Sequence, residues 1–336
     1  MKTILCTGDS HTWGQGAAGV LEGFDPPVQA GELRLTDFRC DSYVNLLRRK
    51  VEETTGSFSK EWEAPCLTAL FEVEYRTPCA CIGIGQQAAM SFTGALMRVE
   101  YSRAGSPCRF EVEIDGETSA RREEPVASGG NDFHILTMRL PDGTHRASFK
   151  VTEGELLLYR IETYGGAFCV INAGVGSCPS FRYRERYFED YVTAVRPDIV
   201  LAEAHTINDW IAGAPPWEYV VNLKTLLEDF RNLGAETILM TVSPIAGEQA
   251  RGGFDYREYV EASRQAARMA GVRICDANRM MELGLAELEE GQSYAWLFED
   301  DWHPNGRGHA IYAELLFQAL CQREVFLPDF RLEKMS

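Results

Sequence analysis

The 336-residue sequence lacks long hydrophobic runs and an excess of basic residues. No stretch approaches the roughly 18 consecutive apolar residues of a membrane span. The short apolar run at the N-terminus leads directly into polar residues and glycines, unlike a secretory signal peptide. We therefore expect a cytoplasmic protein with no membrane partner. The 33 Lys and Arg residues are outnumbered by 50 Asp and Glu residues, for a net charge of −17. Such a surface repels phosphate backbones, so we expect no nucleic-acid partner and favour a neutral substrate.

Metal-ligating patterns are also lacking. The ten cysteines are scattered, and Cys6 and Cys275 lie in apolar, strand-like runs, as is typical of small buried side chains in a reducing compartment. Cys79 and Cys81 form a C-x-C pair, but no second pair follows at the spacing of a zinc site. We predict no metal site and no cofactor, and we expect His134 and His145 to be structural or surface residues.

Apolar runs alternate with amphipathic segments in both terminal parts of the chain. Strands are predicted at 3–6, 168–171, 199–202, 237–242 and 272–275, and helices at 41–53, 182–195, 217–233, 256–270 and 306–321. This alternation indicates an α/β fold, a parallel sheet covered by helices on both faces. We assign it to residues 1–61 and 165–336. Ligands of such sheets bind at the carboxyl ends of the strands.

Residues 62–164 interrupt that pattern. Short strand candidates occur at 67–75, 97–101, 109–114, 133–140, 146–151 and 156–162, with no helical periodicity. The pairs Asp115-Gly116 and Asp142-Gly143 are typical of hairpin turns. The segment therefore predicts an antiparallel β-sandwich inserted into the α/β domain. An exposed sandwich edge can pair with another copy, so a homo-oligomer is possible, although the sequence does not determine the oligomeric state.

Ser10 is the candidate nucleophile. The segment Gly8-Asp9-Ser10-His11-Thr12-Trp13-Gly14 directly follows the first predicted strand. A tight turn at the carboxyl end of a strand exposes both the serine hydroxyl and a backbone N–H. The G-x-S-x-G segment of α/β-hydrolases is absent, and a capped strand-to-helix turn would have the same composition. A serine hydroxyl also needs a neighbouring base.

His303 is the candidate base and Asp300 its partner. The histidine lies in a polar turn just before the last predicted helix. Asp300, three residues earlier, can reach the other ring nitrogen, which would fix the tautomer and stabilise the imidazolium. The alternative is a surface turn with a helix-capping aspartate.

Two further segments can supply oxyanion donors. The glycine-rich segment with Gly176 and Ser177 follows the strand at 168–171, and Asn208 follows the strand at 199–202. Backbone N–H groups can approach a ligand closely at glycines, and an asparagine amide is a second donor. Together with the Ser10 N–H, these groups would lie on the same edge of one sheet as the nucleophile and the base.

With these four segments, the chain resembles the SGNH or GDSL hydrolase family. Its first block, G-D-S-x-T-x-G, and its last block, D-x-x-H, are both met in full, by residues 8–14 and 300–303. In the third block Asn208 and Asp209 match, while Thr206 stands in place of the usual glycine. The resemblance implies a three-layer α/β/α, flavodoxin-like fold. It also implies metal-free hydrolysis of acyl esters through a serine acyl-enzyme.

The inserted segment has a resemblance of its own. The turns Phe92-x-Gly94, Ile114-Asp115-Gly116 and Leu140–His145 look like those of jelly-roll modules that accompany some carbohydrate esterases. Trp13, Trp210 and Trp302 adjoin the site segments, and an indole suits a sugar ring because it combines a flat apolar face with an N–H. We predict removal of short acyl groups, such as acetyl, from a small-molecule or oligosaccharide ester. Packing of these tryptophans in the core is the alternative.

Two other functions also fit the sequence. One is a lipase, lysophospholipase or thioesterase, which an activity profile over acyl chain length would distinguish. The other is a glycan-binding protein with an inactive hydrolase site, which labelling with a fluorophosphonate would test.

Overall fold

The computed structural model describes residues 1–18, 38–63, 70–72, 78–103, 107–124, 134–246, 250–251, 253–286 and 293–321. These residues form two compact units. The α/β unit contains the described residues of 2–20, 39–51 and 170–336. The β unit contains those of 52–169 together with Met1 and Phe38. No described helix is long and apolar enough to cross a membrane.

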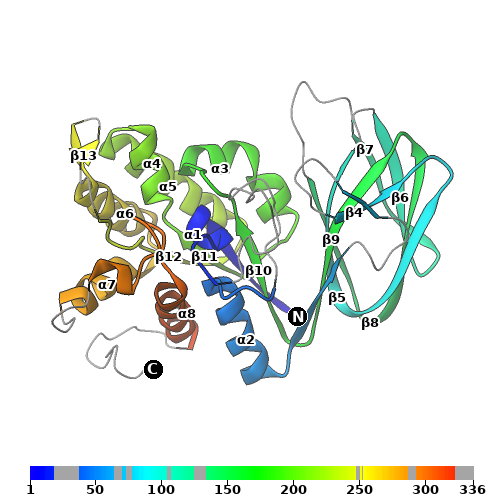
Figure 1. The fold of residues 1–336 in the computed structure, drawn as a ribbon, viewed down its shortest axis with the longest axis horizontal. Helices are drawn as coiled ribbons and strands as arrows, with labels where there is room; N and C mark the ends of the chain where they lie inside the picture. Colours follow the sequence, from blue (N-terminus) through cyan, green and yellow to red (C-terminus); the bar gives the residue numbers. More distant parts are fainter. Residues whose placement is uncertain are drawn as a thin grey trace. The chain divides into compact units, whose positions relative to one another are not determined.

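A five-stranded parallel sheet forms the centre of the α/β unit (Figure 1). Its strands are β1 (Lys2–Gly8), β10 (Phe168–Gly174), β11 (Ile199–Glu203), β12 (Glu236–Met240) and β15 (Arg273–Cys275). Their order across the sheet is β10-β1-β11-β12-β15, which is the flavodoxin-like order that the sequence predicted. The order reverses between β1 and β11, where ligands of such sheets bind.

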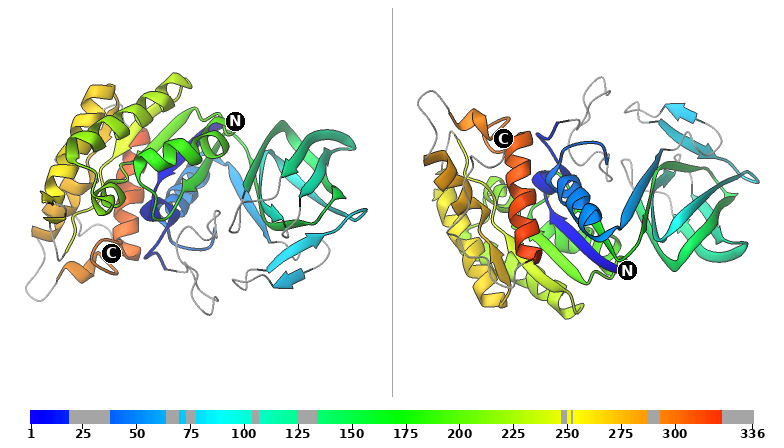
Figure 2. Two further views of the ribbon diagram at one scale, coloured as in Figure 1. Left: turned by 90° about the horizontal axis from the view of Figure 1, so that it is seen from above. Right: turned by 90° about the horizontal axis from the view of Figure 1, so that it is seen from below.

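Helices cover both faces of this sheet, as Figures 1 and 2 show. On one face lie α2 (Tyr43–Thr55) and α8 (Gly306–Cys321), which pack together through the rings of Tyr43 and Tyr312, 5.7 Å apart. On the other lie α3 (Ser180–Arg186), α5 (Pro216–Asn232) and α6 (Tyr256–Ala270). The other helical segments described are α1 (Ser10–Trp13), η2 (Glu189–Thr193), α4 (Thr206–Ala212), α7 (Ala277–Ala286) and η3 (Tyr294–Trp296). The predicted α/β architecture is confirmed.

The helix predicted at 182–195 is interrupted. α3 ends at Arg186, and η2 follows as a π-helical turn in which the Ala194 N–H donates to the Glu189 carbonyl. This wider turn leaves Tyr191 and Val192 buried. α2 begins two residues later than predicted, at Tyr43.

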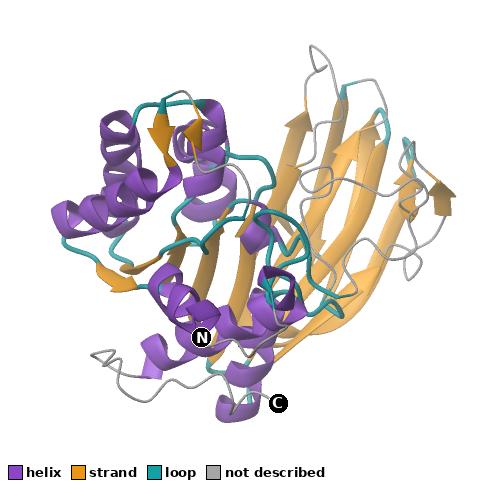
Figure 3. Cartoon of the chain, turned by 60° about the vertical axis from the view of Figure 1, so that its left-hand side comes forward, coloured by secondary structure: helices purple, strands orange, loops and turns teal. Residues whose placement is uncertain are grey.

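The β unit contains an antiparallel sheet of eight strands within the described residues, drawn in orange in Figure 3. The strands are β2 (Phe58–Glu63), β3 (Leu70–Glu72), β4 (Pro78–Ile82), β5 (Gln87–Arg103), β6 (Cys108–Ile114), β7 (Glu117–Glu124), β8 (His134–Glu153) and β9 (Leu156–Gly165). Their order is β3-β4-β9-β5-β8-β6-β7, and β2 also pairs with β9. The predicted antiparallel insertion is present, although its ladders join into one sheet rather than the two of a sandwich.

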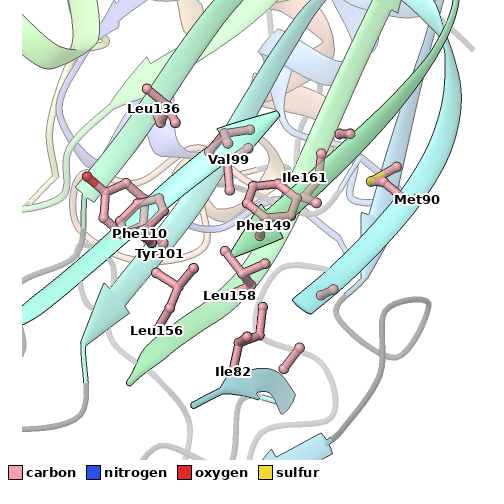
Figure 4. Close-up of a cluster of buried hydrophobic side chains, with 14 of the residues drawn as sticks. Ile82, Met90, Val99, Tyr101, Phe110, Leu136, Phe149, Leu156, Leu158 and Ile161 are labelled. Carbon is pink, nitrogen blue, oxygen red and sulfur yellow. The ribbon is translucent and has the colours of Figure 1, made fainter. Parts of the chain in front are cut away.

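A bulge in β5 lets this one sheet curve around one core. The register with β8 shifts between Gly94 and Leu96. At this shift Ala95 of β5 stands opposite residues 140–142 of β8. Because successive side chains of a strand alternate between faces, an odd number of unpaired residues exchanges the faces. Ala88, Met90 and Phe92 before the shift, and Met97, Val99 and Tyr101 after it, therefore belong to the same buried cluster, part of which Figure 4 shows. A Cβ on Gly94 would collide with the Tyr164 carbonyl, so this bend needs glycine.

The two predicted hairpin turns have different outcomes. Asp115 and Gly116 form a tight turn between β6 and β7, and both have positive φ, as a type I′ turn requires. The prediction for Asp142-Gly143 is wrong, because both residues lie inside β8, where Gly143 pairs with Gly94. The predicted strand at 67–75 coincides with β3 at 70–72, and its other residues lie outside the described ones.

The described cysteine side chains are all free thiols. Six are buried: Cys6, Cys40, Cys108, Cys169, Cys178 and Cys275. Cys66 and the side chain of Cys79 lie outside the described part, so the C-x-C pair is not described as a pair.

Candidate active site

Ser10 begins α1 directly after β1, at the carboxyl edge of the parallel sheet. The Asp9 side chain accepts a hydrogen bond from the His11 N–H and so caps this short helix. A Cβ on Gly8 would collide with the side chains of Thr12 and Glu203, so only glycine allows the turn to approach β11 this closely. Ser10 is 5% exposed.

His303 lies beside Ser10 and connects it to Asp300. Ser10 Oγ lies 2.9 Å from His303 Nε2, and His303 Nδ1 lies 2.7 Å from Asp300 Oδ2. Because an ionised carboxylate can only accept, Nδ1 carries the hydrogen and Nε2 is free to accept the serine proton. These two contacts give the geometry of an activated serine.

Asp300 is held in its ionised form. Partial burial by itself would raise the pKa of this carboxyl, but hydrogen bonds from the His303 ring and from the N–H groups of His303 and Trp302 outweigh it and lower the pKa to about 2. Asp300 therefore remains an acceptor for His303 over the whole range in which a histidine titrates.

The loop that carries His303 is closed by its own backbone. The Glu299 N–H donates to the His303 carbonyl and the Asn305 N–H donates to the Leu297 carbonyl, each at 2.9 Å. The Asn305 side chain then accepts from the Arg307 N–H and caps α8. His303 is thereby fixed between a closed turn and a helix start.

The predicted oxyanion loop after β10 is bonded to the nucleophile turn. The Val175 N–H donates to the Gly8 carbonyl at 2.9 Å, and Asn172 donates from its amide to the Thr12 carbonyl at 2.9 Å. A Cβ on Gly174 would collide with the Trp13 backbone N, so this approach also needs glycine. Gly176 is partly exposed and Ser177 is exposed, with a positive φ of 54°.

Asn208 lies in the first turn of α4 and contacts the same turn from the other side. Its Nδ2 donates to Asp9 Oδ2 at 2.7 Å. An asparagine amide has two N–H donors, so one remains for a substrate. The structure thus brings Asn208 next to the residue that precedes Ser10.

Asp9, Glu203 and His205 form a buried cluster under Ser10. The Glu203 carboxylate accepts from the Asp9 N–H and from the His205 N–H, each at 2.7 Å, and so joins the end of β1 to the start of α4. One potential ligand atom of each cluster residue lies within 4.8 Å of the other two, the spacing that a metal ion would require. Burial and the charge of Asp9 raise the pKa of Glu203 well above its ordinary value. We assign the cluster the role of a brace between the two turns, because Glu203 accepts hydrogen bonds from both of them.

Asp209, the partner of Asn208 in the sequence motif, points away from Ser10. It accepts from the Ser180 N–H at 2.7 Å and from the Ser180 hydroxyl at 3.1 Å, at the start of α3. Burial raises the pKa of this carboxyl to about 7. Its role is to anchor α3.

The three tryptophans predicted to bind substrate differ in exposure. Trp13 is 2% exposed and Trp210 is 1% exposed, and the Trp210 ring packs against Tyr256 at 5.6 Å. Neither offers a ring face to a sugar, because α1 and α4 bury them against the core. Trp302 is half-buried, with its ring 6.3 Å from that of His303.

Sequence reasoning missed the residues that hold the site together. Asp9, His11 and Glu203 have partners far away in the chain, so no local pattern reveals them. A polar residue such as Glu203, at the end of an otherwise apolar strand, was the signal available.

This combination of a flavodoxin-like parallel sheet with a serine, a histidine and an aspartate at its carboxyl edge defines the class of SGNH-type hydrolase folds. Residues 152–311 match the family model of the GDSL-like Lipase/Acylhydrolase family, the family that the sequence segments resemble. The matched range contains Asn208, Asp300 and His303. Ser10 precedes this range in the sequence.

The chain is also similar to several solved structures. One is a peptidoglycan O-acetylesterase, at 15% identity over 95% of this chain and 90% of the other, with a TM-score of 0.48. A second is a family two carbohydrate esterase from Clostridium thermocellum in complex with cellohexaose, at 14% identity over 78% and 98%, with a TM-score of 0.34. A third is an acetyl xylan esterase, at 19% identity over 46% and 81%, with a TM-score of 0.41. No curated protein matches the sequence.

Proposed function

We propose that the protein is a serine ester hydrolase that acts through an acyl-enzyme on Ser10. The observation that carries this proposal is the unbroken hydrogen-bonded line from Ser10 through His303 to Asp300. An ionised aspartate, a histidine with a free Nε2 and a serine at the sheet edge are the parts that acyl transfer needs.

In the proposed mechanism, His303 Nε2 takes the Ser10 proton as Oγ attacks the ester carbonyl. Asp300 holds the imidazolium that results. The oxyanion accepts from the Ser10 N–H, from a backbone N–H at Gly176 or Ser177, and from the second amide hydrogen of Asn208. His303 then protonates the departing alcohol and activates the water that releases the acid.

For the substrate, we propose a short acyl group, such as acetyl, on a carbohydrate. Trp302 supports the sugar part, because its indole is partly exposed and lies next to His303. A flat apolar ring with an N–H matches the mixed surface of a sugar.

The test is a panel of p-nitrophenyl acetate, longer acyl esters and acetylated sugars, assayed with the wild type and Ser10→Ala side by side. The variant should lose roughly four to six orders of magnitude in kcat, as triad deletions do. Ser119→Ala, in which an exposed serine of β7 is changed, is the matched control and should retain full activity. Substantial activity in Ser10→Ala would overturn the mechanism, and a preference for long acyl chains would overturn the substrate.

A further inference from the structure

His11 has an acceptor at each of its two ring nitrogens. Nδ1 lies 3.0 Å from Asp9 Oδ1, and Nε2 lies 2.9 Å from the Trp302 carbonyl oxygen. Both partners can only accept when Asp9 is ionised. The two contacts are therefore satisfied together only if both ring nitrogens carry a hydrogen. The ring is fully buried, so bulk solvent does not replace either partner.

We propose that His11 is held as an imidazolium and is a positioning residue, which fixes the His303 loop against the Ser10 turn. His11 Nδ1 is hydrogen-bonded to Asp9, the residue before Ser10. His11 Nε2 is hydrogen-bonded to the carbonyl of Trp302, the residue before His303. Only the kinetic part of this inference rests on the proposed ester hydrolysis.

Asp9 is equipped to hold a buried imidazolium. Burial opposes the charge of this carboxyl, but the His11 ring and N–H lower the pKa of Asp9 below its ordinary value. The Asn208 amide donates to its other oxygen at 2.7 Å. An aspartate with donors on both oxygens is the counter-ion that a buried histidine cation requires.

The result is one line of hydrogen bonds through three parts of the site. It runs from Asn208 to Asp9, from Asp9 to His11, and from His11 to the Trp302 carbonyl. It therefore joins the proposed oxyanion donor, the nucleophile turn and the loop of the base. Ser10 and His303 are 293 positions apart in the chain, and this line is a second connection between their two segments.

His309, in the first turn of α8, has the opposite arrangement of hydrogen-bond partners. Its Nδ1 accepts from the Tyr43 N–H at 3.2 Å, and its Nε2 donates to the Gln15 carbonyl at 3.0 Å. Burial lowers the pKa of His309 to about 3. A donor on one side and an acceptor on the other select the neutral ring, whereas two acceptors select the cation at His11.

His145 in the β unit repeats the His11 pattern. Its ring nitrogens lie 2.7 Å from Asp115 Oδ2 and 2.8 Å from the Pro141 carbonyl. The hydrogen bond to Asp115 raises the pKa of His145. His145, with two acceptors, and His309, with one donor and one acceptor, therefore serve as comparisons for His11.

The first test is side-chain nitrogen NMR of the wild type labelled at its histidines, of which the chain has six. Signals are assigned with His11→Gln, His145→Gln and His309→Gln. At pH 7, we expect His11 and His145 each to show two protonated nitrogens and His309 to show one. A single protonated nitrogen on His11 overturns the inference, whether or not the protein is an esterase. The variants serve only to assign the signals, and the protonation states are measured on the wild type.

The second test is kinetic. His11→Gln should lower kcat on p-nitrophenyl acetate by about 10- to 100-fold with little change in KM, because a misplaced base costs rate more than binding. His145→Gln is the control and should leave kcat unchanged. An unchanged kcat in His11→Gln overturns the positioning role. Retention of activity in Ser10→Ala, by contrast, would reject the proposed function and leave the NMR result standing.

Discussion

At the scale of single residues, the hydrogen-bond partners of Asp300, Ser10 and Asp9 determine which atoms donate and which accept. Asp300 faces donors only, Ser10 faces the one ring nitrogen that can accept, and Asp9 is enclosed by donors from His11 and Asn208. Such preorganised groups stabilise developing charge without reorganising during the reaction. One amide hydrogen of Asn208 is bonded to Asp9, and the proposed mechanism assigns the other to the oxyanion.

Asn208→Ala tests the proposed role of this residue as an oxyanion donor. Removal of one oxyanion donor should lower kcat by about 10²–10³ while KM changes little. Steady-state kinetics on p-nitrophenyl acetate, with the melting temperature measured in parallel, separates rate from stability. A change confined to KM would make Asn208 a binding residue rather than an oxyanion donor.

Residue by residue, the sequence indicated the candidate triad, whose side chains the structure brings together, better than the residues that support it. Ser10, Asp300 and His303 lie in short segments whose spacing is itself the signal. The exposure of Trp13 and Trp210 depends on how α1 and α4 pack, which no local pattern contains. The sequence did not indicate that His11 connects two segments, because its second partner, the Trp302 carbonyl, lies near the other end of the chain.

At the scale of elements, hydrogen bonds connect neighbouring turns of the site. Glu203 joins β11 to the Ser10 turn and to the start of α4, and Val175 joins the loop after β10 to Gly8. Asp209 extends the series to α3 through Ser180. Its carboxyl has a raised pKa, which makes this last link dependent on pH.

Asp209→Asn should therefore stabilise the protein at neutral and higher pH. A carboxyl whose pKa rises from 3.8 to about 7 on folding keeps its proton in the folded state at pH values where the unfolded chain has lost it. Its contribution to stability accordingly falls as pH rises from about 4 to 7. The change is on the order of 4 kcal/mol at most. The asparagine oxygen can still accept from the Ser180 N–H.

The measurement is urea unfolding of both proteins from pH 4 to pH 8. The advantage of Asp209→Asn should grow across this range. Asp255→Asn is the control, because Asp255 caps α6 but is partly exposed. An Asp209→Asn variant less stable than the wild type at pH 8 would contradict the prediction.

β7 (Glu117–Glu124) is an element that the sequence analysis did not predict. β7 has the sequence ETSARREE and is mostly exposed, so it shows no alternation. It forms a strand because it pairs with β6 at the end of the sheet. Asp142-Gly143 does not form a hairpin turn, because it lies where the β5–β8 ladder shifts register and β8 continues along β5 on both sides of the shift.

At the scale of the whole molecule, the net charge of −17 sets how charged substrates approach. Each unit has an acidic composition, and a field of one sign changes association rates for ions far more than for neutral molecules. The charge therefore bears on substrate choice but not on the fold.

Anionic esters should be poorer substrates than neutral ones of the same size. Their kcat/KM should rise several-fold between about 20 mM and about 200 mM salt, because screening shortens the reach of the repulsion. The neutral ester is the internal control and should respond little. A preference for the anionic ester that weakens with salt would reveal a local basic site and contradict the prediction.

The separation of Ser10 and His303 by 293 positions also has a consequence in time. During synthesis the nucleophile leaves the ribosome first, and the base follows only after the entire β unit has been made. No nascent or truncated chain that ends before His303 can assemble the pair. If Ser10 and His303 act as proposed, reaction of Ser10 with an active-site probe would report a chain that extends past His303.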